Sequence, residues 1–345
     1  MESATTRSAA TWTSLAAIVL ALPVAFGGLA CGGRDGTTVI KLAHGLDVTH
    51  PVHQAMIRMD EIVAADSGGR VRLDIYPSEQ LGSERECVEL LQIGSIGMTK
   101  VSASVAEAFI PSFKVFSLPY VFRDREHVFA VLEGEIGREL LLEGLDSRLR
   151  GLGYFDAGGR SFYTRDIAVR SPADLTGLKI RTQESATAMS MVRALGGSAT
   201  PISWGELYTA LQQGIVDGAE NNPPSFYLSG HYEMCRYYSL NQHTWVPDVL
   251  LMNKRVWDAL DPKEQEIVER AALEAAEFQK TIWAEASGEA LAAVEKAGVE
   301  IIYPDKKPFM EAVEPLIEAY REQPAIWKWI ERIRQVQTPD AEELP

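Results

Sequence analysis

Apolar positions along this chain follow two spacings, one typical of strands and the other of helices. Short apolar or alternating runs predict strands at residues 39–43, 71–76 and 98–101. Between them, apolar side chains at helical spacing predict helices at 50–67 and 84–93. This alternation predicts an α/β fold with a largely parallel sheet and flanking helices.

The same two spacings continue to the end of the chain. Further strands are expected at 160–164, 179–181, 216–219, 248–252 and 300–303. Further helices are expected at 184–195 and 206–213, with two more after Pro308. Residues 263–287 contain neither glycine nor proline, and a helix of that span would be about 35–40 Å long. Such a helix could tie two domains together, or it could lie on the surface of one domain.

The first thirty residues have the pattern of an export signal. Residues 12–30 are almost all apolar or small, but Pro23 and Gly27 interrupt them, which fits a signal peptide (1–30) better than a membrane span. Cys31 follows directly and resembles a bacterial lipoprotein acceptor, although Gly28 stands where such a motif usually has leucine. Two alternatives remain: a chain lipidated at Cys31, or a cleaved chain without an anchor. In both, the mature protein acts outside the cytoplasm.

Composition narrows the class of partner. The 345 residues carry 33 Lys and Arg against 48 Asp and Glu, a formal net charge of −15. The length suggests about two domains. The acidity argues against nucleic acid and against an anionic membrane surface, which require basic footprints. It does not exclude an anionic small molecule, because net charge describes the surface and a binding site is local.

Catalytic and metal-binding motifs are absent from the sequence. His50 and His53 share a helical spacing, but Pro51 between them favours a helix-capping or surface role over metal binding. Cys87 and Cys235 are far apart, which favours two buried free thiols over a disulfide bridge or metal ligands. By elimination the sequence predicts an exported binding protein without cofactor or metal, rather than an enzyme.

Several segments of the chain resemble one family. They are YPSEQLGSE (76–84), SLPYVFRDREH (117–127), PADLTGLKIRTQES (172–185) and GGSATPISWGELYTALQQGIVDGAENNPPS (196–225), with GGR at 158–160 and NQH at 241–243. In this order they resemble the extracytoplasmic solute-binding proteins of TRAP transporters, the DctP-like group.

The resemblance implies a two-domain clamshell that closes on a ligand, with a long helix spanning both domains. Domain I would comprise 37–157 plus 247–286, and domain II 158–246 plus 287–335. The protein would deliver its ligand to TRAP permease subunits in the membrane, driven by an ion gradient, commonly sodium, rather than by ATP.

The resemblance also assigns ligand-binding residues. Arg181 matches the arginine of the GLKIR motif, which holds the substrate carboxylate in the family, and it stands at a strand end, where ligands bind in open α/β sheets. Without the family context, such an arginine is more often a surface or ion-pair residue. Arg160 matches a second family arginine, and Asn221 matches an asparagine that hydrogen-bonds the ligand. Trp204 falls where some members place an aromatic ring against the ligand; core packing is the alternative.

Two further features resemble the sugar-acid binders of the family. They are Asn222, in the sequence ENNPPS, and His243 shortly before Val246-Pro247. Amide and imidazole groups suit a ligand rich in hydroxyls, because each buried hydroxyl requires a hydrogen-bond partner. Candidate contacts from domain I are His44, Lys100, Ser102 and Glu84 or Glu86. Lys100 could also serve a second carboxylate or lie on the surface.

The sequence therefore predicts a periplasmic binding protein for a sugar acid such as a uronate or aldonate. Within the family, the alternative is a binder of C4-dicarboxylates or 2-oxo acids. Outside it, a ligand-sensing module and an exported lyase or hydrolase are the rival classes.

Overall fold

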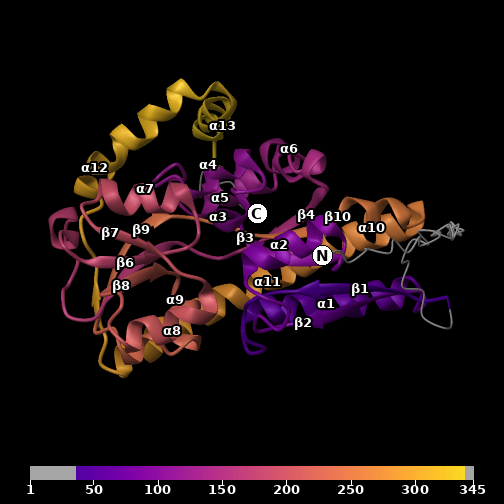
Figure 1. The fold of residues 1–345 in the computed structure, drawn as a ribbon, viewed down its shortest axis with the longest axis horizontal. Coiled ribbons are helices and arrows are strands. Elements are labelled where there is room, and N and C mark those ends of the chain that lie inside the picture. Colours follow the sequence, from indigo (N-terminus) through magenta and orange to yellow (C-terminus); the bar gives the residue numbers. More distant parts are fainter. Residues whose placement is uncertain (1–35, 339–345) are drawn as a thin grey trace, which may run out of the picture. The chain divides into compact units, whose positions relative to one another are not determined.

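A computed structural model describes residues 36–338 of the chain. The expected signal peptide and Cys31 lie outside the described residues. Within them, no helix is both long enough and apolar enough to cross a membrane. Two separate β-sheets organise the described residues, and helices cover them (Figure 1).

The first sheet has five strands in the order β2-β1-β3-β10-β4. They are β1 (Thr38–Ala43), β2 (Val71–Tyr76), β3 (Met98–Ser102), β4 (Leu149–Phe155) and β10 (Asp248–Asn253). Strand β1 pairs in parallel with β2 and with β3. Helices α1 (Pro51–Asp66) and α2 (Glu84–Ile93) connect these strands along the chain, and both lie close to their predicted ranges. Buried apolar side chains of β1 and α1, among them Leu42 and Met59, form the core between them.

The second sheet has six strands in the order β11-β9-β5-β8-β6-β7. They are β5 (Arg160–Thr164), β6 (Lys179–Thr182), β7 (Ser198–Pro201), β8 (Gly218–Asn221), β9 (Tyr237–Thr244) and β11 (Glu300–Ile302). Helices α7 (Ala186–Ala194), α8 (Trp204–Gln212) and α9 (Pro223–Leu228) follow β6, β7 and β8 along the chain.

Both sheets are largely parallel, as expected, but each contains one strand that runs antiparallel to the others. In the first sheet β10 runs antiparallel to β3 and β4, and in the second β5 runs antiparallel to β8 and β9. Each of these strands enters its sheet directly from the other sheet, through the short links 156–159 and 245–247. To run parallel to its neighbours, the new strand would have to begin at the far end of its sheet, and a connection of about a dozen residues would be needed to reach that end. A short link reaches only the near end, so the new strand runs antiparallel.

Three strands have no counterpart among the predicted elements, namely β4, β7 and β9. Two glycines interrupt the apolar run of β4, which has the sequence LRGLGYF, and the sequences of β7 (SATP) and β9 (YYSLNQHT) are largely polar. Their strand character comes from pairing with neighbours, which hydrophobic spacing does not report.

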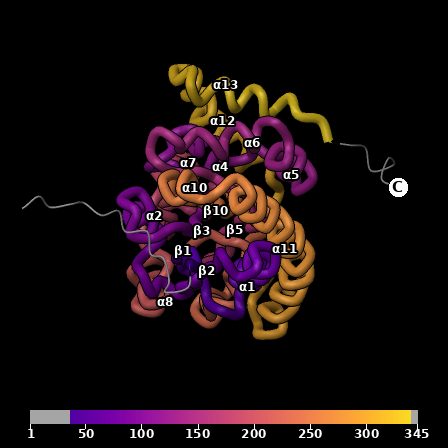
Figure 2. The backbone as a smooth tube through the Cα atoms, turned by 90° about the vertical axis from the view of Figure 1, so that its right-hand side faces the viewer, coloured from indigo at the N-terminus to yellow at the C-terminus, as the bar shows by residue number. Residues whose placement is uncertain are grey.

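Helix α11 (Pro262–Lys296) ties the two halves together. A capping box between Asp261 and Glu264 fixes its start, and its 35 residues extend about 50 Å. It packs against α1 and β4 of the first half and against α9 of the second. Figure 2 shows it as a long orange helix beside α1. Of the two alternatives left open by its periodicity, the helix that spans both halves is therefore confirmed.

Shorter helices complete both halves. They are α3 (Ala103–Ala106), α4 (Lys114–Ser117), α5 (Arg125–Leu132), α6 (Glu135–Leu142), α10 (Lys254–Ala259), α12 (Lys307–Glu318) and α13 (Pro324–Gln335). The 3-10 segments are Pro111–Phe113, Leu145–Ser147, Pro172–Leu175, His231–Glu233 and Ala319–Glu322. Helix α13 buries Trp329 and Ile333 in the core of the first half, although the expected division places it in domain II. The division into domains therefore stays a proposal.

The link between β4 and β5 is fastened to α11 by one side chain. Gln279 is fully buried, accepts a hydrogen bond from the Asp156 backbone N–H at 2.8 Å, and donates one to the Asp156 carbonyl at 2.8 Å. Both backbone groups belong to a crossover between sheets, where no strand partner satisfies them.

Replacing this amide should destabilise the protein. We expect Gln279→Leu to lower the free energy of unfolding by about 1–3 kcal/mol, because two buried backbone groups lose their partners. Gln54→Leu on exposed α1 surface is the matched control, with an expected change within about 0.5 kcal/mol. Urea unfolding followed by circular dichroism measures both, and equal midpoints for the two variants would contradict the assignment.

Candidate functional site

A cavity lies where the parallel strands of both sheets end, and its empty space is about 610 Å³ when the part that opens to solvent is included. It is lined by Leu46, His50, Glu84, Lys100, Ser102, Val105, Ala157, Arg160, Arg181, Gln183, Glu184, Ile202, Ser203, Trp204, Asn221, Asn222, Ser225, Val246, Asp248 and Trp283. The crossover strands also begin here, since Asp248 pairs with Ser102 and Ser161 pairs with Asn221. The lining thus combines the ends of parallel strands with the starts of antiparallel ones.

In the part of the chain that the structure describes, Arg181 is the cation of this lining that has no ion-pair partner. It is buried in β6, and its Nε donates to the carbonyl of Ile202 at 2.8 Å. Its buried Nη1 has no hydrogen-bond partner among the described residues. Burial lowers the pKa of Arg181, which reflects the cost of holding a cation away from water. A carboxylate would offset this cost, because its two oxygens match the guanidinium fork.

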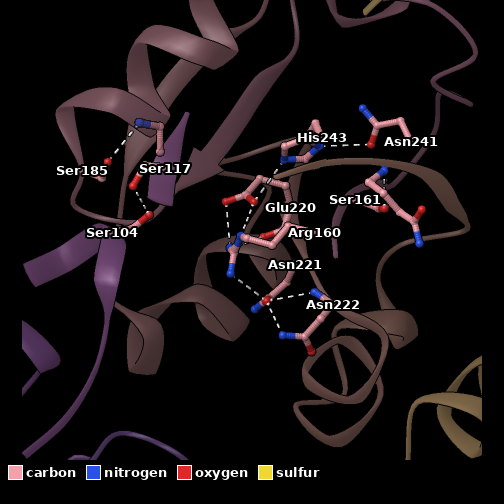
Figure 3. Close-up of polar contacts among 12 residues, drawn as sticks. Ser104, Ser117, Arg160, Ser161, Ser185, Glu220, Asn221, Asn222, Asn241 and His243 are labelled. Atoms are coloured by element: carbon pink, nitrogen blue, oxygen red, sulfur yellow. Dashed lines mark hydrogen bonds and ion pairs between the residues drawn. The ribbon is translucent and has the colours of Figure 1, made fainter. Parts of the chain in front are cut away.

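Arg160 is buried and already paired (Figure 3). Its Nε and Nη2 donate to the two carboxylate oxygens of Glu220 at 2.6 and 2.8 Å, and its Nη1 donates to Oδ1 of Asn221 at 2.9 Å. Burial alone would raise the pKa of Glu220, but Arg160 and His243 outweigh it and lower that pKa to about 2. The charge of Arg160 is therefore neutralised within the protein.

His243 lies behind this pair and does not line the cavity. Its Nε2 is 3.4 Å from Glu220, its Nδ1 is 3.0 Å from Oδ1 of Asn241, and its ring stacks on Phe162. The prediction that His243 contacts the ligand is therefore not supported by its position. The imidazole instead positions the carboxylate of Glu220, which in turn positions Arg160.

The two asparagines lie at the end of β8 and line the cavity. Asn222 caps α9, since its Oδ1 accepts from the Ser225 N–H at 2.8 Å, and its Nδ2 donates to Asn221 at 3.1 Å. Oδ1 of Asn221 accepts from Arg160 and from both N–H groups of Asn222 (Figure 3). Among the described residues, Nδ2 of Asn221 donates to no protein group, which leaves a donor at the cavity.

The first sheet contributes a buried ammonium held by two carboxylates. Lys100 lies 2.8 Å from Glu84 and 3.2 Å from Asp248, and Glu84 also accepts from the Ser102 backbone N–H. Burial would lower the pKa of Lys100, but the two carboxylates raise it overall. Lys100 is neither a surface residue nor a free cation. With Glu84 and Asp248 both ionised, this end of the cavity has a formal excess of one negative charge, and burial raises the pKa of Asp248. Glu86, the alternative to Glu84, instead forms the capping box of α2 with Ser83.

Of the three histidines near α1, His50 lines the cavity, and His44 and His53 do not. His50 caps α1, as its sequence context favours, and its Nε2 lies 3.4 Å from Ser225 Oγ of the second half. His44 lies outside the lining, where its Nε2 is 2.9 Å from Nδ1 of His53, so its position does not support the predicted ligand contact. Burial lowers the pKa of His44 to about 2 and that of His50 to about 3.

The position of Trp204 does not decide between the two alternatives set out for it. It lines the cavity, and it also packs against the cores of both halves and lies edge-on to His231 at a centroid distance of 5.2 Å.

The two cysteines of the described residues agree with the sequence analysis. Cys87 and Cys235 are buried and free, as predicted, and burial raises the pKa of each to about 12. Within residues 36–338, no cluster of three or more His, Cys, Asp or Glu side chains could hold a metal ion.

Eight of the ten ligand-binding residues predicted from the sequence lie in this lining. Other lining residues were not predicted. His50, Asp248 and Trp283 belong to the same cavity. Asp248 had a usable signal, because it is the first residue of a predicted strand directly after Pro247. His50 and Trp283 had none, because their place depends on how α1 and α11 pack.

Comparison with known families and structures agrees with this architecture. Residues 42–323 match the DctP model, described as bacterial extracellular solute-binding protein, family 7. The chain is 38% identical to YiiZ of Salmonella typhimurium over 87% of its own length and 92% of that protein. It is similar to a TRAP periplasmic solute-binding protein of Xanthobacter autotrophicus with bound β-D-galacturonate, at a TM-score of 0.84 and 37% identity over 86% of this chain and 100% of that one. A Pseudomonas putida counterpart with bound D-glucuronate has a TM-score of 0.84 and 36% identity, covering 89% and 100%.

The buried Arg160–Glu220 pair predicts acid sensitivity. Because the pKa of Glu220 is lowered from 4.5 to about 2, its stabilisation is complete above about pH 4.5 and is lost as the pH falls towards 2. We expect Glu220→Gln to cost about 3–5 kcal/mol at neutral pH, since it leaves Arg160 buried without a counter-charge. The difference from wild type should narrow as the pH falls through this range.

Urea midpoints across this pH range test the expectation. Glu89→Gln removes the carboxylate of an exposed pair with Arg85 and serves as the control, with an effect of about 0–1 kcal/mol. A pH-independent difference between wild type and Glu220→Gln would count against the assigned role.

Proposed function

Because the chain belongs to the DctP family of bacterial extracellular solute-binding proteins, the binding components of TRAP transporters, we propose that it captures a sugar acid in this cavity. A uronate or an aldonate would be bound as a monocarboxylate and delivered to the membrane permease. The observation that carries the proposal is the buried guanidinium of Arg181, whose Nη1 has no partner among the described residues.

The carboxylate of the ligand would bind Arg181. Arg160 is neutralised by Glu220 and would act as an oriented donor rather than as a second cation. Asn221 adds a free amide donor beside it. This division refines the sequence expectation, in which both arginines hold the carboxylate.

The hydroxyls of the ligand would meet the opposite end of the cavity. Glu84 and Asp248 offer acceptor oxygens around Lys100, and His50, Asn222 and Ser102 supply further polar groups. Trp204 and Trp283 provide flat apolar surface for the face of a sugar ring. A pyranuronate carries both kinds of group, and the similar proteins from Xanthobacter autotrophicus and Pseudomonas putida hold such ligands.

A C4-dicarboxylate fits this arrangement less well. Its second carboxylate would need a second unpaired cation, and Lys100 is already shared by two carboxylates. Bringing a further anion to a buried site with excess negative charge is unfavourable.

The mechanism we propose is capture without turnover, in the periplasm. The halves, divided as 37–157 plus 247–286 and 158–246 plus 287–335, would close around the ligand by bending at the links between sheets. The closed surface would then be recognised by the permease, whose transport runs on an ion gradient. A lipid anchor at Cys31 would hold the protein near the membrane.

Loss of the free guanidinium should abolish ligand binding. We expect Arg181→Ala to weaken D-glucuronate or D-galacturonate binding by about 100-fold or more, because a buried charge-assisted pair is lost. Arg193→Ala, which removes an exposed arginine on α7, should leave affinity unchanged. Isothermal titration calorimetry measures both, and tight binding by Arg181→Ala would refute the proposal.

Ligand selectivity separates the sugar-acid hypothesis from its alternatives. In a thermal-shift panel, uronates or aldonates should raise the melting temperature, and succinate, malate and 2-oxo acids should not. Stabilisation by the dicarboxylates alone would favour the alternative within the family. Proton NMR of ligand incubated with the protein should show no new compound, whereas turnover would place the protein among lyases or hydrolases.

A further inference from the structure

Two carboxylates of the first half reach across to helices of the second half. Glu79, in the loop after β2, accepts a hydrogen bond from the backbone N–H of Gly205 at 3.1 Å. Gly205 lies in the first turn of α8, next to Trp204 of the cavity lining. The N-cap residue Ser203 makes no side-chain capping bond, so Glu79 supplies the cap from the other half.

Glu107 makes the equivalent contact with α7. This residue follows α3 and is buried, and its Oε1 accepts from the Ser185 hydroxyl at 2.8 Å and from the Thr187 backbone N–H at 3.0 Å. Its Oε2 is buried and has no hydrogen-bond partner among the described residues. Ser185 follows Glu184 of the cavity lining.

The backbone around Glu79 is held in an unfavourable conformation. Ser78 and Glu79 have φ values of 54° and 56°, in the left-handed region that residues other than glycine rarely adopt. The loop is fixed there by hydrogen bonds from Ser78 N–H to the Leu46 carbonyl and from Glu79 N–H to the His44 carbonyl. The carboxylate is thereby presented to α8 on a rigid support.

We propose that Glu79 and Glu107 are latches that hold the two halves together over the bound ligand. This inference rests on the proposed function. Arg160, Arg181 and Asn221 are almost completely buried, and separation of the halves would expose a ligand bound to them. Separation breaks both carboxylate contacts, each of which places a negative charge at the positive end of a helix dipole. The two residues are positioning residues that set how long the ligand stays bound.

The dissociation rate is the direct test. For D-glucuronate or D-galacturonate, whichever binds more tightly, we expect Glu79→Ala and Glu107→Ala each to raise the dissociation rate about tenfold. The association rate should change by less than about threefold, because the latches form after the ligand has entered. Stopped-flow tryptophan fluorescence measures both rates, and Glu61→Ala on exposed α1 surface is the control.

Gly205 offers a second variant that leaves Glu79 in place. A Cβ atom at this position would lie 2.2 Å from Oε2 of Glu79, so Gly205→Ala must displace the carboxylate. It should reproduce the effect of Glu79→Ala and add nothing in the Glu79→Ala background. Glu107→Gln keeps an acceptor oxygen without the charge, so its dissociation rate should lie between those of wild type and Glu107→Ala.

Distinct outcomes separate this inference from the proposed function. Wild-type protein that binds no uronate and no aldonate contradicts the proposed function alone. The latch is then tested by small-angle scattering of unliganded protein, where the Glu79→Ala/Glu107→Ala double variant should have a larger radius of gyration. An unchanged radius there, or unchanged dissociation rates in a wild type that does bind, overturns the latch.

Discussion

The structure depends on two links between the sheets that are too short to carry the chain back to the far end of the next sheet. Because residues 156–159 and 245–247 carry the chain directly from one sheet into the other, β5 and β10 must begin where the parallel strands of their new sheet end. This places Arg160 beside Asn221 and Asp248 opposite Ser102. The polar ends of both sheets consequently face one cavity, and its three cations, Lys100, Arg160 and Arg181, all lie on strands rather than on loops.

Charge compensation then decides what the cavity can hold. Glu220 neutralises Arg160, and Glu84 and Asp248 more than neutralise Lys100. Within residues 36–338, Arg181 is left as the one cation of the lining without an acidic partner, so one end of the cavity favours an anion and the other favours neutral hydroxyls. The formal charge of −15 has no bearing on this, because buried pairs are governed by neighbours within a few ångströms.

The connections between the two halves are of two kinds. Helix α11 and the crossover links are covalent, and the buried amide of Gln279 fixes one link to that helix. The contacts of Glu79 and Glu107 join separate segments through hydrogen bonds that can break and re-form. A binding protein needs both kinds, since the halves must keep their pairing while the entrance to the cavity opens.

The sequence by itself determined the α/β class, most strand and helix positions, the long helix and most of the cavity lining. The fold class and the element positions follow from the local spacing of apolar residues. The cavity lining follows from segments that resemble one family and extend over nearly the whole chain after residue 36. Only the tertiary structure decided that the sheets are mixed, that His243 lies behind Glu220, and that Lys100 is shared by two carboxylates. The physical reason is that strand direction, burial and ion pairing depend on groups brought together from distant positions, and hydrophobic spacing carries no information about them.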